Sequence, residues 1–284
     1  MMSKMQYGSD YMKIPAYSME SGNTTEVLPD LSTYTNKIVN LHMVGTPDDG
    51  DFVLVDAGLP DSSDEIIKAV EDRFGEGARP KAIILTHGHF DHVGSIIELI
   101  ETWDVPVYAH KLELPYLTGQ EPYPEPDPTV EGGMMAKTAA MFPREPIDLG
   151  NNVEPLPADG TVPHMPEFEW IHTPGHTQGH VSLYRASDRT LIVGDAFVTV
   201  QQDSLYKTMV QKKEIQGPPV YYTTDWEAAR ASVEKLQSIE PETAVFGHGK
   251  ALEGEELRED LEKLADNFDE IAVPSHGKYV DDDK

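Results

Sequence analysis

The densest group of chemically active side chains lies in residues 86–92, which read THGHFDH. This run contains three imidazoles and one carboxylate, from His87, His89, His92 and Asp91. Imidazole and carboxylate are ligands with which proteins hold zinc and similar divalent metals. Stability alone does not explain such a density of ligand side chains, so the run predicts a hydrolytic metal centre.

The spacing of these side chains fits two neighbouring ions. The run directly follows the apolar residues 82–85, which predict a strand, and side chains two apart in an extended chain point to the same side. His87 and His89 can therefore converge on one ion. Asp91 and His92 lie at the predicted start of a helix, where the turn directs them toward a second ion.

Three further ligand candidates follow predicted strands later in the chain. His176 lies in TPGHT, Asp195 in VGD and His248 in FGHG, each beside small residues. The simplest explanation is that these strand ends converge at one edge of the sheets. His276, in SHGK, is a second candidate for the last ligand, but it lies beyond the final helix, whereas His248 directly follows a strand.

Strands and helices alternate along the chain, which indicates an α/β fold and one domain over residues 1–284. The apolar patterns predict strands at 38–44, 52–55, 82–85, 105–108, 168–171, 181–184, 191–193 and 243–246. Helical spacing predicts helices at 65–70, 93–100, 225–239 and 253–271. Residues 1–30 are expected to form an irregular N-terminal segment, and 113–146 and 197–224 to form inserted loops of the kind that serve as lids or binding loops.

The order H-x-H-x-D-H, followed by His, Asp and His, resembles the metallo-β-lactamase superfamily, and within it the glyoxalase II/lactonase-like branch. The resemblance covers about residues 36–273. It implies a four-layer αββα sandwich, the metallo-β-lactamase fold, with a dinuclear site between the sheets. On this resemblance one ion is bound by His87, His89 and His176, the other by Asp91, His92 and His248, and both by the bridging Asp195. Zinc suits these ligands, with two ions per chain, and iron or manganese can occupy the same cage.

Two more residues are expected to support the ligands. Asp56, in DAG, resembles a common superfamily feature and is interpreted as an acceptor that orients a ligand histidine, with a plain turn aspartate as the alternative. His180, which follows Gly179, is expected to pack against the site rather than to bind metal. Asp91 is the catalytic candidate, because its carboxylate can orient a hydroxide or accept its proton.

The ligand set predicts a dinuclear zinc hydrolase that attacks a small ester, lactone or thioester with a metal-bridging hydroxide. Cysteine is absent from the sequence, which excludes the β-lactamases that use a cysteine ligand. His89 stands where flavo-diiron relatives carry Glu. Val198 stands where lactonases usually carry Tyr, and the candidates to replace that tyrosine are Tyr206, Tyr221 and Tyr222. Two alternatives are a mononuclear iron oxidoreductase of the persulfide-dioxygenase type and a non-catalytic metal-binding interaction protein.

Composition and charge predict the cellular location of the protein and the kinds of partner that it binds. The formal net charge of −28 at pH 7 disfavours nucleic acid, because an acidic surface repels phosphates. No apolar run is long enough to cross a bilayer, and residues 1–30 lack the pattern of a secretory signal. These features predict a cytoplasmic protein that acts on a small-molecule substrate without nucleic acid or membrane. The irregular N-terminus and the Met-rich insertion are compatible with a homodimer.

Overall fold

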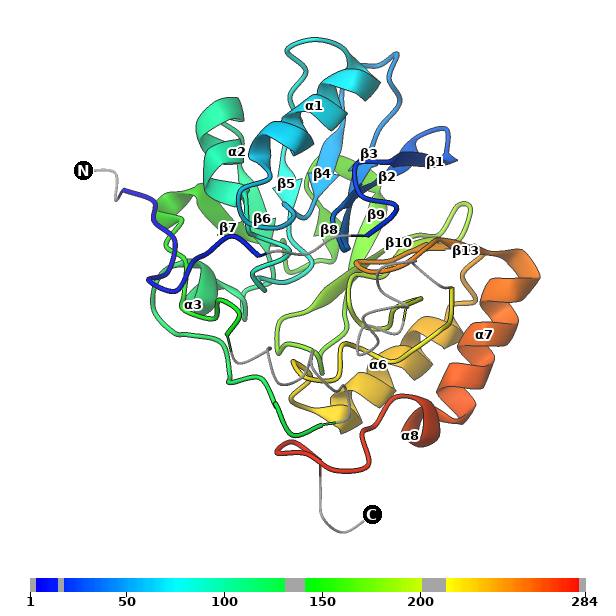
Figure 1. Cartoon of the computed structure of the whole chain (residues 1–284). Coiled ribbons are helices and arrows are strands. Elements are labelled where there is room, and N and C mark those ends of the chain that lie inside the picture. The colour runs from blue at the N-terminus through cyan, green and yellow to red at the C-terminus, as the bar shows by residue number, and fades with distance from the viewer. Residues whose placement is uncertain (1–3, 15–17, 131–140, 201–212, 281–284) are drawn as a thin grey trace. The chain divides into compact units, whose positions relative to one another are not determined.

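The computed structural model describes residues 4–14, 18–130, 141–200 and 213–280. The chain forms two compact units, of which the first comprises Met1–Tyr123 and Pro143–Pro166 and the second Pro124–Phe142 and Glu167–Lys284. Figure 1 shows the elements along the chain, coloured from the N-terminus to the C-terminus. The expectation of one domain over residues 1–284 stays a prediction.

The first unit is built on a seven-stranded mixed sheet with the order β1-β2-β3-β4-β5-β6-β7. Strands β1 to β4 pair antiparallel, and β4 to β7 pair parallel. The bounds are β1 (Thr24–Leu28), β2 (Leu31–Asn36), β3 (Val39–Val44), β4 (Val53–Val55), β5 (Ile83–Ile84), β6 (Val107–Ala109) and β7 (Val153–Pro155). The antiparallel pairing of β3 with β4 agrees with the two strands expected at 38–44 and 52–55.

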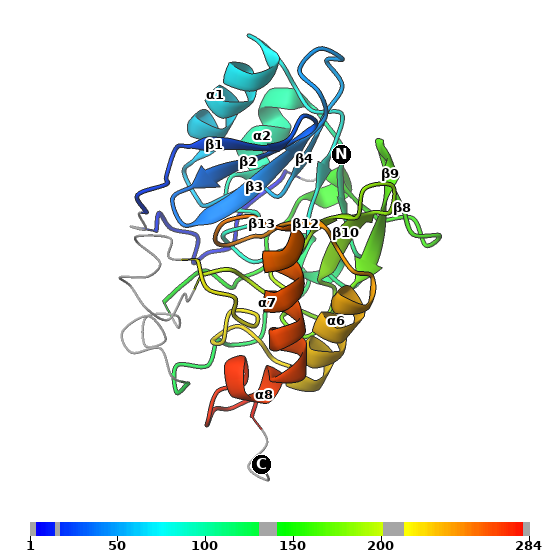
Figure 2. The same ribbon diagram turned by 90° about the vertical axis from the view of Figure 1, so that its right-hand side faces the viewer.

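Two amphipathic helices, α1 (Ser63–Phe74) and α2 (Ile96–Trp103), lie over this sheet (Figures 1 and 2). Ile66 of α1 and Leu99 of α2 join one hydrophobic core with Leu54 and Ile83 of the strands. Burial of these apolar side chains is the main favourable term that holds the helices to the sheet. A short helix α3 (Leu114–Leu117) and a 3-10 helix η1 (Gly150–Asn152) follow among the described residues of this unit.

The second sheet is also mixed and has the order β13-β12-β11-β10-β9-β8. Its bounds are β8 (Thr161–Val162), β9 (Met165–His172), β10 (Val181–Arg185), β11 (Thr190–Ile192), β12 (Thr243–Val245) and β13 (Leu252–Glu253). The boundary between the two units runs through β9. Strands β11 and β12 pair parallel, whereas β9–β10, β10–β11 and β12–β13 pair antiparallel.

The helices of the second unit pack on a core of their own. They are α6 (Trp226–Ser238), α7 (Gly254–Asp266) and α8 (Phe268–Ile271), and α6 and α7 lie side by side (Figure 2). Val233 of α6 and Leu261 of α7 belong to the same buried cluster as Phe246, which follows β12. The carboxylate of Asp225 caps α6 by accepting the backbone N–H of Ala228 at 2.9 Å, which satisfies one donor of the first helical turn.

The strands place the predicted ligands in the segments that follow them. Strand β5 leads into His87, β9 into His176, β11 into Asp195 and β12 into His248. Each of these four side chains therefore lies after a strand, as the sequence predicts.

The structure corrects several expected boundaries. Strand β1 lies within residues 1–30, which were expected to be irregular, and the predicted helix 253–271 is interrupted at Asn267 into α7 and α8. The predicted helix 93–100 begins only at Ile96, because residues 91–95 continue the turn. The predicted loop 113–146 contains α3, and its residues 131–140, like 201–212 of the loop 197–224, lie outside the described part. Within the described ranges, no helix is both long and apolar enough for a membrane crossing.

Candidate metal centre

The His-rich run forms a tight turn between β5 and α2 in the first unit. The backbone N–H groups of His92 and Val93 both donate to the carbonyl of His89, at 2.8 and 3.1 Å. The rings of His87 and His89 have centroids 4.7 Å apart, and those of His87 and His92 lie 4.2 Å apart. A carboxylate oxygen of Asp91 lies within 4.8 Å of a ring nitrogen of His92. The turn therefore gathers the four ligand candidates of this unit, with the three imidazoles buried.

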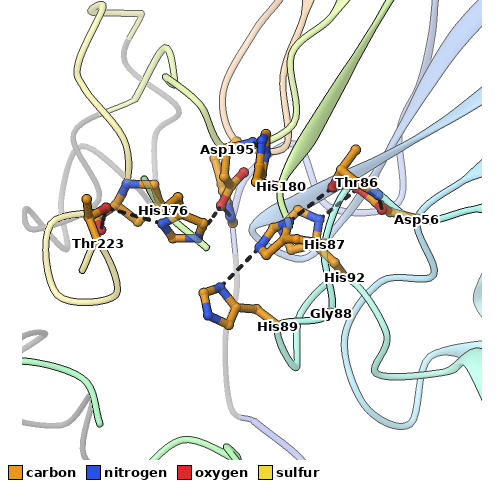
Figure 3. A network of polar contacts seen from close by, with 12 residues as sticks. Asp56, Thr86, His87, Gly88, His89, His92, His176, His180, Asp195 and Thr223 are labelled. Carbon is orange, nitrogen blue, oxygen red and sulfur yellow. Dashed lines mark hydrogen bonds and ion pairs between the residues drawn. The ribbon is translucent and has the colours of Figure 1, made fainter. Parts of the chain in front are cut away.

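Asp56, just after β4, holds this turn through its carboxylate (Figure 3). One oxygen accepts the backbone N–H of Thr86 at 2.8 Å. The other accepts the Thr86 hydroxyl and Nδ1 of His92, both at 2.8 Å. Because a carboxylate only accepts, Nδ1 of His92 carries the proton, and the lone pair of the neutral ring lies on Nε2. Asp56 therefore makes the contact that the sequence suggested for it.

Thr86 orients His87 by the same logic. Its hydroxyl has one proton, which it donates to Asp56, so Thr86 accepts in its 3.1 Å contact with Nδ1 of His87. The lone pair of neutral His87 then lies on Nε2, which is 3.1 Å from Nδ1 of His89. Two ring nitrogens this close can present their lone pairs to one cation. Thr86 was not singled out from the sequence, although it directly precedes His87.

Gly88, between the two histidines, is held by two residues of the loop 113–146. Its N–H donates to Glu113 at 3.0 Å and to the Tyr123 hydroxyl oxygen at 2.9 Å, and the Tyr123 hydroxyl donates to the same Glu113 oxygen. Burial raises the pKa of Tyr123 well above its ordinary value, and the neighbouring Glu113 raises it further, so the phenol keeps its proton. A Cβ on Gly88 would lie 2.5 Å from that hydroxyl oxygen, so no larger residue fits without a shift.

Three predicted ligands gather in the second unit, around Asp195, and two of them, Asp195 and His176, are labelled in Figure 3. One oxygen of this carboxylate lies 3.6 Å from Nε2 of His176 and 3.3 Å from Nε2 of His248, and all three side chains are buried. Thr223 donates its hydroxyl proton to the carbonyl of Pro219 at 2.9 Å, so it accepts from Nδ1 of His176 at 3.3 Å. The lone pair of neutral His176 therefore faces a carboxylate oxygen. A divalent cation bound to both atoms would stabilise this arrangement.

The remaining candidates of the second unit lie around or outside this cluster. Nε2 of His180 accepts the backbone N–H of Asp195 at 2.8 Å. His276 is exposed and its Nδ1 lies 3.0 Å from the Ser275 hydroxyl, so the structure brings His248, and not His276, to Asp195. Val198 is buried, and so are Tyr221 and Tyr222, which pack against each other with ring centroids 5.2 Å apart. Tyr206 lies outside the described residues.

The donor chemistry of both clusters fits a divalent transition metal. Imidazole nitrogens and carboxylate oxygens are suitable ligands for such ions. Burying these polar groups is costly unless they are paired, hydrogen-bonded or bound to metal. The hydrogen bonds on Nδ1 of His87, His92 and His176 satisfy one side of each ring and place the lone pair of a neutral ring on Nε2, an arrangement typical of metal-binding histidines.

Comparison with known proteins identifies the family. The family model described as "Metallo-beta-lactamase superfamily" matches residues 34–248, which include all seven predicted ligands. The chain belongs to the metallo-β-lactamase superfamily. Its α/β fold, with two mixed sheets and their helices, is the fold of that superfamily, so the predicted fold class is confirmed.

Individual relatives of this superfamily member extend over most of the chain. It is 46% identical over 249 residues to "Probable metallo-hydrolase YflN" of Bacillus subtilis, an alignment that covers 87% of this chain and 94% of the relative. "Probable metallo-hydrolase YybB" of the same organism is 36% identical over 165 residues, covering 58% and 66%. The crystal structure of a metallo-beta-lactamase family protein from Thermus thermophilus has the same fold, with a TM-score of 0.58, 20% identity and coverage of 86% and 80%.

In this superfamily member, the substitution Asp56→Asn is expected to weaken metal binding by about 10- to 100-fold, as is typical when the outer partner of a ligand histidine is lost. Asn tolerates the left-handed backbone of Asp56, whose φ is 65°, but it offers one acceptor oxygen where Asp56 uses two. Competition against a chromophoric chelator measures the affinity. Asp61→Asn is the matched control, because Asp61 has a φ of 59° but is exposed and pairs with Lys13. Equal losses in both variants would contradict the role of Asp56.

Proposed function

We propose that this metal-dependent hydrolase is a dinuclear zinc enzyme that hydrolyses a small ester, lactone or thioester. The superfamily assignment and the two relatives named metallo-hydrolases support the reaction class. In this proposal one ion is held by His87, His89 and His176, the other by Asp91, His92 and His248, and both by Asp195.

The observation that carries the proposal is the orientation of the ring nitrogens. Nδ1 of His87, His92 and His176 each donates to an oxygen that can only accept there, so each neutral ring keeps its lone pair on Nε2. Nε2 of His176 faces the carboxylate of Asp195 at 3.6 Å. This shared orientation of three buried rings supports a metal site, because Nε2 would be the ligating atom in each.

Different residues would have different roles in hydrolysis. Divalent ions bound by these ligands would polarise a substrate carbonyl and lower the pKa of a water molecule. A carboxylate oxygen of Asp91, the least buried of the candidates in the His-rich turn, would accept the proton of the attacking water. Asp56 and Thr86 keep the lone pairs of His92 and His87 on Nε2. The chain has no cysteine, so the acyl group would pass to water without a thiolate nucleophile.

Metal analysis combined with a substrate panel tests this function. Protein purified without chelators is expected to contain about two zinc ions per chain, as a two-metal site requires. It is expected to hydrolyse members of a panel of aryl esters, lactones and thioesters, followed by acid release. One iron per chain together with oxygen consumption would overturn the proposal in favour of an oxidoreductase. Full metal occupancy without turnover of any panel member would overturn the assigned substrate class.

A further inference from the structure

A chain of buried hydrogen bonds runs through the second unit beside Asp195. The backbone N–H of Asp195 lies 2.8 Å from Nε2 of His180, and Nδ1 of His180 lies 2.8 Å from the Thr173 hydroxyl. That hydroxyl lies 3.1 Å from the Ser182 hydroxyl, which in turn lies 2.7 Å from the carbonyl of Val193. Thr173 and His180 lie in the loop between β9 and β10, and Ser182 lies in β10.

The proton positions in this series of hydrogen bonds follow from the backbone N–H of Asp195 at one end. A backbone amide can only donate, so Nε2 of His180 accepts. A neutral imidazole with Nε2 as acceptor has its proton on Nδ1, and Nδ1 therefore donates to the Thr173 hydroxyl oxygen.

The Val193 carbonyl, at the other end of the series of hydrogen bonds, independently requires the same proton positions. A backbone carbonyl can only accept, so the single proton of Ser182 is donated to Val193. Thr173 must then donate its own proton to Ser182, and it is left to accept from His180. The backbone N–H of Asp195 and the backbone carbonyl of Val193 therefore both require the Nδ1–H form of His180.

The two backbone ends flank one sharp turn. Val193 and Asp195 lie on either side of Gly194, whose φ is 64°, a left-handed conformation that favours glycine. The side chains of the three linking residues are buried, with Thr173 at 1% exposure and His180 and Ser182 at 0%. In such surroundings hydrogen bonds strengthen one another and an unmade bond is costly. This series of hydrogen bonds therefore stabilises the turn that carries the Asp195 carboxylate.

We propose that Asp195 N–H, His180, Thr173, Ser182 and the Val193 carbonyl form a polarised hydrogen-bond relay that holds His180 in its Nδ1–H tautomer and thereby positions the Asp195 carboxylate. His180, Thr173 and Ser182 are positioning residues, since they act on the carboxylate through the backbone. The inference rests on the proposed function, in which Asp195 is shared by two ions, but the tautomer of His180 is a property of the metal-free chain.

Long-range ¹H–¹⁵N NMR of the metal-free protein tests the relay directly. The ring signals of His180, assigned by comparison with His180→Gln, are expected to show a protonated Nδ1 and an unprotonated Nε2. An Nε2–H tautomer in the wild-type protein would overturn the relay whatever the enzyme hydrolyses. Loss of hydrolysis with the expected tautomer would instead count against the proposed function alone.

The variants test the positioning role. Ser182→Ala removes the acceptor of the Thr173 proton and with it one of the two constraints on the His180 ring, so the Nδ1–H signal of His180 is expected to shift and zinc affinity to fall about tenfold, in the range found for outer partners of metal ligands. His180→Gln keeps an acceptor for the Asp195 N–H and is expected to retain more zinc affinity than His180→Leu. Equal affinities for Gln and Leu, or unchanged His180 signals and affinity in Ser182→Ala, would overturn the inference.

A matched control separates the relay from the general cost of losing a buried hydroxyl. Ser95, in the first unit, is also fully buried and also donates to a carbonyl, that of Leu59, at 2.7 Å. Ser95→Ala is expected to lower thermal stability about as much as Ser182→Ala but to leave the His180 ring signals unchanged. If Ser95→Ala changed those signals equally, their change in Ser182→Ala would reflect stability alone and the relay would be rejected.

Discussion

Replacing Asp195 by Asn is expected to lower kcat/KM by about three orders of magnitude, which corresponds to about 4 kcal/mol of lost transition-state stabilisation. The carboxylate lies 3.3 Å from Nε2 of His248 and 3.6 Å from Nε2 of His176, and in the proposed function it neutralises charge on both ions. Asn keeps the size of the side chain and removes its charge. Turnover of an active panel substrate measures the effect, and the zinc content is expected to fall below two ions per chain.

Asp188→Asn is the control for loss of an aspartate from the same unit. Asp188 lies in the hairpin between β10 and β11, where its carboxylate pairs with Arg185 at 2.7 Å. This variant is expected to keep its kcat/KM and zinc content, even where its stability falls. An Asp195→Asn enzyme that retained wild-type kcat/KM would exclude a shared carboxylate at this position.

Removing the metal is expected to lower the Tm by roughly 8 °C. A ligand at about 1,000 times its dissociation constant stabilises the folded state by about 4 kcal/mol, and each kcal/mol shifts the Tm of a chain of this size by about 2 °C. The physical cause is the buried ligand set, in which His176 and His248 each face Asp195. Calorimetric melts with excess zinc and after dialysis against EDTA measure the difference.

Zinc added back to the chelated protein is expected to restore the Tm. The Asp195→Asn variant serves as the comparison, because its Tm is expected to respond much less to either treatment. Identical melting curves for the wild-type protein with and without metal would show that the clusters do not bind it.

The sequence pointed to the candidate ligands more readily than to the residues that orient them. His87, His176 and His248 could be found because each follows an apolar strand, a signal that lies within a few neighbouring residues. Glu113 and Tyr123 could not be found, because they contact Gly88 from 25 and 35 positions away and no short-range pattern links them to it.

The predicted boundaries of strands and helices were wrong where the pattern of apolar residues is weak or misleading. Strand β1 reads TTEVL and has mostly exposed side chains, so it lacks the alternation of apolar and polar residues that marks a half-buried strand. It forms through pairing with β2, in which Thr24 lies opposite Tyr34. The end of α7 at Asn267 is equally hidden, because helical spacing of apolar residues continues through Phe268.

The contacts of Asp56 can form only after distant parts of the chain have come together during folding. Asp56 reaches Thr86 and His92 across 30 and 36 positions of the chain, and it does so beside the parallel pair β4–β5, whose connection includes α1. Parallel pairing of this kind requires a long crossover and forms slowly compared with local turns. An isolated peptide of residues 86–92 would have the same ligands without this oriented hydrogen bonding. We therefore expect the oriented set of ring nitrogens to form only once the first sheet has assembled, so that the proposed metal site would be incomplete before that stage.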